Sequence, residues 1–146
     1  RCLVHIQRMC KIWLSAYPKS EAGFELREIV CKLHFIDDEV KKQYWIKEFL
    51  DWFEKHKDFL NEKSYSLETG RFWYTHKMVR RCFSVIRKAL PNMFTFLQNH
   101  KIPKTTNGIE SFFCHLKGNL NIHRGLTKSR RKKFIQWYLF YKNLKS

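Results

Sequence analysis

The chain has 146 residues, of which 44% are hydrophobic and 16% aromatic, and it carries a formal net charge of +16. This length corresponds to about one domain with a real core. Its 13 Phe, 6 Tyr and 5 Trp exclude a disordered basic tail, because such a tail lacks apolar surface to bury. The excess charge must lie on the outside of a folded body, where it attracts polyanions. We therefore expect nucleic acid as the partner.

Membrane and secretory classes are not favoured. The longest apolar runs, such as residues 137–141, are far shorter than a bilayer span, so we expect no membrane partner. Residues 1–5 contain no Met and no secretory leader, and we expect the chain to begin within a longer protein. The 5 cysteines form no CxxC pair, which favours reduced thiols and a cytoplasmic location.

Apolar residues at helical spacing predict a largely helical N-terminal region. Pro18 ends the first helix, Ser20 caps the second and Asp37 caps the third. Only Leu3 and Val4 with their neighbours are plausible strand, and residues 61–74 read as a loop. The expected core stripes are Ile6, Met9, Cys10, Trp13 and Leu14; Leu26, Ile29, Val30 and Leu33; Val40, Trp45, Phe49, Trp52, Phe53, Phe59 and Leu60; and Met78, Val79, Cys82, Phe83, Ile86 and Leu90.

Two further helices are expected near the C-terminus. Pro91 starts a short turn through residue 97, and residues 99–106 form an internal boundary. Asn107 then caps one helix and Thr127 caps the last. The fold class is therefore mainly α. The apolar faces of these two helices are Ile109, Phe112, Phe113, Leu116 and Leu120, and Phe134, Trp137, Tyr138 and Tyr141.

Glu110 is the only acid among residues 101–146, a segment that also holds 11 Lys/Arg and so has a net charge of +10. Two interpretations stay open. Glu110 and Lys117 are seven positions apart and share a helix face, so a metal ligand and a phosphate-binding ammonium would line one groove. Alternatively, Glu110 is the capping-box partner of Asn107.

Two basic clusters are candidate DNA contacts. One surrounds the start of the last helix, where cations gain nothing from the helix dipole. The other interleaves aromatic and basic residues in a manner suited to stacking on an exposed base, although buried anchoring of the loop is an equal alternative. The first comprises His123, Arg124, Lys128, Arg130, Arg131, Lys132 and Lys133, and the second Arg71, Trp73, His76, Lys77 and Arg80.

Cys2 and His5 have the spacing of half a zinc site. No second Cys/His pair at a suitable spacing follows, and Cys114 and His115 are adjacent, so they would point to different helix faces. We therefore do not expect a structural zinc ion.

Several stretches, in this order, look like the carboxy-terminal part of bacterial insertion-sequence transposases related to the Mutator group. These enzymes share an RNase H-like core bearing two aspartates and a glutamate, with a helical insertion before the glutamate. The stretches are RCLVH at 1–5, YTHK at 74–77, ALPNMF at 89–94, IPKTTNGIESFF at 102–113, HRGL at 123–126 and RKKFI at 131–135.

The resemblance implies a role for each part of the chain. Residues 1–5 would end a core segment and carry the Cys-x-x-His signature of Cys2 and His5. Residues 6–102 would be the helical insertion, and residues 103–146 the C-terminal core helices with Glu110 as the catalytic glutamate. The intact enzyme would bind two Mg²⁺ ions, act on transposon ends and target DNA, form a homo-oligomer and work in the cytoplasm at the bacterial nucleoid.

The family's core strands and both catalytic aspartates have no counterpart in the chain. Asp37, Asp38, Asp51 and Asp58 lie in the region of the insertion and do not replace them. We therefore expect a transposase fragment that is inactive alone, because one ligand of the metal site is present. The alternative is a non-catalytic helical DNA-binding module, such as a decayed or domesticated transposase remnant.

Overall fold

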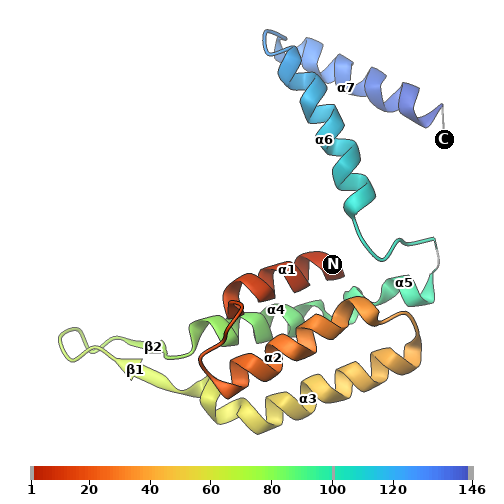
Figure 1. The fold of residues 1–146 in the computed structure, drawn as a ribbon. Coiled ribbons are helices and arrows are strands. Elements are labelled where there is room, and N and C mark those ends of the chain that lie inside the picture. The colour runs from red at the N-terminus through yellow and green to blue at the C-terminus, as the bar shows by residue number, and fades with distance from the viewer. Residues whose placement is uncertain (1, 100, 145–146) are drawn as a thin grey trace. The chain divides into compact units, whose positions relative to one another are not determined.

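A computed structural model describes residues 2–99 and 101–144 of the chain and shows a mainly helical protein (Figure 1). The prediction of a mainly α fold is confirmed. The chain divides into two compact units, Arg1–Thr105 and Thr106–Ser146. The boundary lies inside the predicted segment 99–106, and residues 2–5 belong to the same unit as the helices that follow them.

The first unit contains α1 (Leu3–Leu14), α2 (Glu21–Lys32), a 3₁₀ turn η1 (Leu33–Phe35), α3 (Glu39–Asn61), β1 (Lys63–Tyr65), β2 (Phe72–Tyr74), α4 (Lys77–Met93) and α5 (Thr95–Gln98). Within it, α1 packs on α2 and α4, and α2 packs on α3. The second unit contains α6 (Asn107–Ile122) and α7 (Lys128–Asn143), which pack on each other.

Side-chain caps set the starts of α2 and α3. The Ser20 hydroxyl accepts a hydrogen bond from the Gly23 N–H at 3.2 Å, as predicted. At α3 the prediction of Asp37 was wrong by one residue, because Asp38 accepts the Lys41 N–H at 2.6 Å. Asp38 has the extended backbone of an N-cap, whereas Asp37 forms an ion pair with the Lys41 ammonium.

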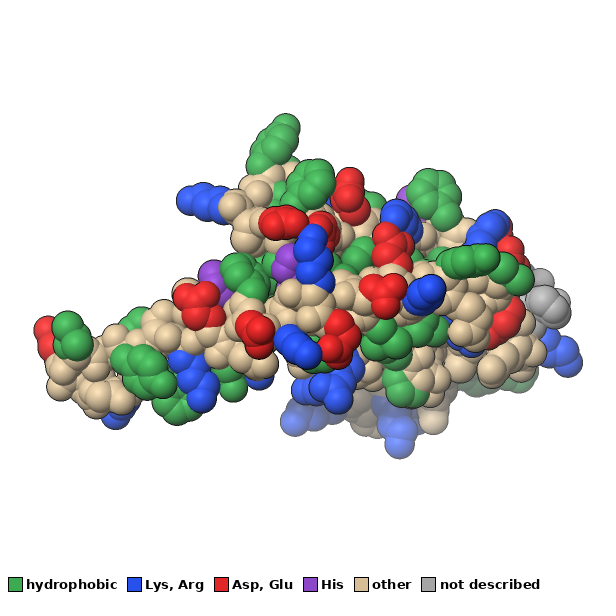
Figure 2. Space-filling model, turned by 90° about the horizontal axis from the view of Figure 1, so that it is seen from below, with side chains coloured by type: hydrophobic (Ala, Val, Ile, Leu, Met, Phe, Trp, Pro, Cys, Tyr) green, Lys and Arg blue, Asp and Glu red, His purple; other side chains and the backbone are tan. Residues whose placement is uncertain are grey.

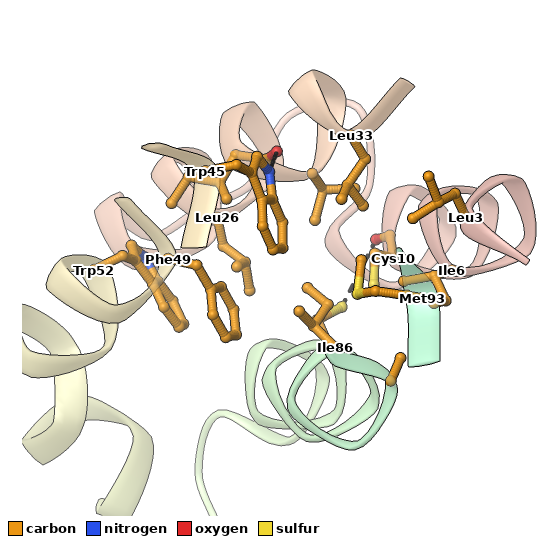
Figure 3. Close-up of a cluster of buried hydrophobic side chains, with 14 of the residues drawn as sticks. Leu3, Ile6, Cys10, Leu26, Leu33, Trp45, Phe49, Trp52, Ile86 and Met93 are labelled. Atoms are coloured by element: carbon orange, nitrogen blue, oxygen red, sulfur yellow. Dashed lines mark hydrogen bonds between the residues drawn. The ribbon is translucent and has the colours of Figure 1, made fainter. Parts of the chain in front are cut away.

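Aromatic side chains of α3 form the centre of the first unit's core (Figure 3). Phe49 stacks on Trp45 and Trp52, with ring centroids 5.5 and 6.1 Å apart. The two indole N–H groups donate to carbonyl oxygens of α2, from Trp45 to Ile29 at 2.8 Å and from Trp52 to Ala22 at 3.1 Å. Both buried donors are satisfied, and α3 is held in register with α2.

Most of the predicted core is confirmed, including Leu26, Ile29, Val30, Trp45, Phe49 and Trp52, and Trp13 is partly buried. Val40 and Met78 were wrongly placed in the core, because they are 64% and 50% exposed. Each lies in the first turn of its helix, before the first buried residue of that helix.

The expected strand at Leu3 and Val4 is wrong, because both residues lie in α1. Leu3 and Ile6 are buried on the same helix face as Cys10. This spacing of three and four positions favours a helix over a strand.

Within the expected loop at 61–74, Asn61 is the last residue of α3, and residues 63–74 form an antiparallel hairpin. The pairs are Lys63 with Tyr74, Ser64 with Trp73 and Tyr65 with Phe72. Gly70 has a φ of 64°, a left-handed conformation that glycine adopts without strain and that lets the chain turn back. The aromatic residues of β2 favour extended backbone, although the strand is too short to give an alternating pattern.

Pro91 was expected to start a new turn, but α4 continues through it to Met93. Ala89 and Met93 on this last stretch are buried in the core. Pro91 has no backbone N–H and so removes one helical hydrogen bond. The burial of Ala89 and Met93 on either side of it offsets this loss, and the helix continues.

Candidate nucleic-acid interface and metal ligand

Glu110 lies in the first turn of α6, and its side chain is exposed. The Thr106 hydroxyl donates to Glu110 Oε1 at 2.5 Å, and the Glu110 N–H donates to the Thr106 carbonyl oxygen at 2.9 Å. Asn107 was expected to be the N-cap, but Thr106 holds that position. The residue three positions after the cap is then Ile109, so the predicted capping box does not form.

Lys117 is exposed one heptad after Glu110 on the same helix. A separation of seven residues is close to two helical turns, so the two side chains leave one face. A carboxylate in the first turn is also favoured by the helix dipole. Glu110 and Lys117 are thus both exposed on the same face of α6, about two turns apart.

The described residues do not fit a Mg²⁺ site by themselves. Mg²⁺ requires octahedral oxygen ligands, and protein sites use one or more carboxylates with waters or phosphates. Among the described residues, no group of three His, Cys, Asp or Glu gathers closely enough to hold a metal ion. Glu110 brings one carboxylate to such a site. Its role as a metal ligand stays a prediction.

Cys2 is the N-cap residue of α1, and His5 lies in the first turn of that helix. Both are partly buried. Within the described part of the chain they are not joined by a third metal-ligating side chain. A role in a family signature stays a prediction.

The basic side chains in the run at the start of α7 are exposed to solvent. Thr127 caps the helix as predicted, accepting the Arg130 N–H at 3.4 Å. No salt bridge formed within residues 2–99 and 101–144 involves the bases of the run. In the preceding turn, His123 lies beside the Phe134 ring and Arg124 donates to the Asn121 carbonyl oxygen at 3.2 Å. The exposed bases of the run are Lys128, Arg130, Arg131, Lys132 and Lys133.

Arg80 and His76 anchor the hairpin. The Arg80 guanidinium donates to the Leu60 carbonyl oxygen and to Asn61 Oδ1, each at 3.0 Å, and lies 3.6 Å from the centre of the Tyr74 ring. His76 stacks on Phe59 with ring centroids 3.5 Å apart. Arg80 and His76 therefore anchor the hairpin, as the alternative interpretation expects. Arg71, Trp73 and Lys77 are exposed.

The structure adds two bases of α4, Arg87 and Lys88, which are both exposed. Arg81, which follows the motif at 70–77 in the sequence, is exposed as well, and its guanidinium lies 4.3 Å from the centre of the Trp13 ring. The sequence signal for this surface is the absence of acids from residues 69 to 109, a stretch with 8 Lys/Arg.

The net charge divides sharply along the chain. Residues 1–68 contain 12 Lys/Arg and 12 acids and are neutral, whereas residues 69–146 contain 17 Lys/Arg and one acid. In the neutral part, Lys55 pairs with Glu21 and Glu25, and Lys42 pairs with Glu39. Acidic and basic side chains accordingly lie side by side on the face shown in Figure 2. The whole excess of positive charge belongs to the hairpin turn, α4 and the segments that follow.

No helix within the described ranges combines the length and the hydropathy that a membrane span requires. Comparison with known proteins gives no relative: no protein-family model, no curated protein and no solved structure matches the chain.

Proposed function

We propose that this chain is the C-terminal part of a Mg²⁺-dependent bacterial transposase and that it binds DNA through its second unit. The observation that supports this best is the setting of Glu110, an exposed carboxylate in the first turn of α6 and the only acid among residues 101–146. A single acid among 11 Lys/Arg adds little to the solubility of this segment, whereas it suits a metal ligand beside bound phosphate.

The division of labour within the second unit follows from charge. The bases at the start of α7 hold the phosphate backbone without reading sequence. Lys117 lies on the face of Glu110 and binds a phosphate oxygen there. Glu110 would contribute one ligand to a Mg²⁺ site whose other carboxylates belong to a core outside this chain, and Mg²⁺ bound there would supply Lewis-acid chemistry for phosphodiester cleavage. Such an enzyme assembles as a homo-oligomer and acts at the bacterial nucleoid.

The DNA-binding part is tested with the chain itself. Binding of a DNA duplex should fall by about 10³-fold or more between low and physiological salt if six or more phosphates are bound. Changing Arg130, Arg131, Lys132 and Lys133 to Gln should reduce the salt slope by about 0.9 for each phosphate that the variant no longer binds. The matched control changes Lys41, Lys42, Lys47 and Lys57 of α3 to Gln, which removes the same charge and should leave the slope unchanged.

Equal losses of affinity in the two variants would mean that the total charge, and no particular surface, determines binding. Binding that ignores salt would remove the argument from phosphate binding altogether.

The catalytic part needs the longer protein that contains the two aspartates. Glu110→Gln keeps the size of the side chain and removes the charge that holds the metal. DNA cleavage should be abolished while the melting temperature and DNA binding change little. Intact cleavage with a lowered melting temperature would show that Glu110 only stabilises the start of α6.

The second candidate is a non-catalytic DNA-binding module. It is favoured by the single carboxylate, because the described residues do not complete a metal site. It predicts the same salt dependence and no effect of Glu110→Gln beyond stability.

A further inference from the structure

The first unit has a basic surface of its own, formed by the hairpin and α4, in addition to the basic run of α7. A hollow of about 590 Å³ lies between β2 and α4, and the residues that line it include Phe72, Trp73, Lys77, Arg80, Arg81 and Lys88. Within the described part of the chain, no Asp or Glu lines it. We call this hollow the hairpin groove.

Aromatic rings in the hairpin groove lie beside cations. Phe72 and Trp73 are 54% and 41% exposed, which is unusual for large rings that have a core nearby. The Lys77 ammonium lies 5.8 Å from the centre of the Trp73 ring, and Lys63 lies 4.6 Å from that of Phe72. These contacts hold cations next to ring faces that remain accessible to solvent.

The bases of α4 follow the groove. Lys77, Arg81 and Lys88 lie at positions i, i+4 and i+11, which share one helix face. They span roughly 16 Å along the axis, from the helical rise of about 1.5 Å per residue. Arg80 and Tyr74 form a fixed wall, because the guanidinium is already bonded to the end of α3. The groove therefore offers a line of cations beside stacking surfaces.

We propose that the hairpin groove binds single-stranded DNA, with a base stacked on Trp73 and the phosphates bound by Lys77, Arg81 and Lys88. A duplex needs only the cations, because its bases already stack on one another. An unpaired nucleotide exposes both a base face and a phosphate, and the groove offers a partner to each. The absence of acids along the groove removes the repulsion that a polyanion would otherwise meet.

The choice of DNA rests on the proposed function, but the groove lies in a different unit from the basic run of α7. The two sites are therefore tested separately. Loss of the α7 bases should weaken single-stranded and duplex DNA alike, whereas loss of Trp73 should affect only the single strand.

The experiment measures binding of the whole chain to four probes by fluorescence anisotropy. These are an oligothymidine of about 16 nucleotides, an abasic oligomer of the same length and charge, an RNA oligomer of the same length, and a duplex. The unchanged chain should prefer oligothymidine to the abasic oligomer. Trp73→Ala should weaken oligothymidine binding by about 5- to 100-fold and abolish that preference, with duplex binding unchanged. Trp73→Phe should restore most of the affinity, and Tyr17→Ala, which removes a ring that is 90% exposed on the neutral part, should have no effect.

Three results would overturn the proposal. One is equal binding of oligothymidine and the abasic oligomer by the unchanged chain. Another is a loss of affinity in Trp73→Ala that is the same for the duplex as for the single strand. The third is tighter binding of an RNA oligomer than of DNA, which would assign the groove to a different nucleic acid. The variant with Gln at the four α7 positions separates the two proposals. If it binds every probe normally while Trp73→Ala still weakens oligothymidine binding, the proposed DNA binding by α7 is wrong and the proposal for the hairpin groove is supported.

Discussion

Replacing Arg80 with Ala should destabilise the first unit by about 2–4 kcal/mol. The guanidinium makes two hydrogen bonds of 3.0 Å to the end of α3, one of them to the Leu60 main chain. Hydrogen bonds from a charged group contribute about 1.5–3 kcal/mol, and the contact with the Tyr74 ring adds about 0.5–1 kcal/mol. Because Arg80 and Asn61 are partly solvated, the total lies well below the sum of the upper limits.

The assay is urea unfolding followed by far-UV circular dichroism, together with amide hydrogen exchange. Exchange should rise most in β1 and β2, because Arg80 links the hairpin to both α3 and α4. Arg87→Ala is the matched control, since Arg87 is exposed about two turns further along the same helix. Its removal should cost less than about 0.5 kcal/mol.

The reasoning is refuted if Arg80→Ala and Arg87→Ala have equal stability while only Arg80→Ala loses DNA affinity. Arg80 would then bind a phosphate directly and would not be an anchor. A change of protection confined to α1 or α2 would also contradict it, because neither helix is bonded to the guanidinium.

Two further changes test the core and its pH response. Trp45→Phe leaves the buried Ile29 carbonyl without its 2.8 Å donor and should cost about 1–3 kcal/mol in urea unfolding, whereas Trp137→Phe, at a side chain that is 58% exposed, should be neutral. Hydrogen bonds from Lys55 and then His56 lower the pKa of Glu25 from its ordinary value of 4.5. This contribution to stability is complete above pH 4.5 and is lost as the pH falls through the lower folded-state pKa, so acid unfolding of Glu25→Gln should show a shallower pH dependence in this range.

Helical periodicity predicted the core well, because Trp45, Phe49 and Trp52 recur on one face of a long helix and need no knowledge of their partners. Helix starts were less predictable. Asp37 and Asp38 are adjacent acceptors, as are Thr106 and Asn107, and the choice between neighbours depends on backbone angles that the rest of the fold sets.

The hairpin and its groove were the least predictable part. Each strand has three residues, too few to show alternation, and the aromatic residues of β2 resembled a loop motif. The different roles of Arg80 and Arg81 depend on how the hairpin returns to α4. Adjacent arginines on a helix point in different directions, and only the folded chain shows which one reaches the end of α3.

The packing of α1 on α4 has a consequence for synthesis of the chain. Cys10 and Cys82 are both fully buried where these helices meet, and they are 72 positions apart. At a translation rate of about 5–20 residues per second, the ribosome needs roughly 4–14 seconds to make the chain between them. During that interval α2 and α3 are able to pair, but the apolar face of α1 has no α4 to cover it. The part of the α1 face that packs on α4, which includes Cys10, therefore stays uncovered on the nascent chain until α4 has emerged.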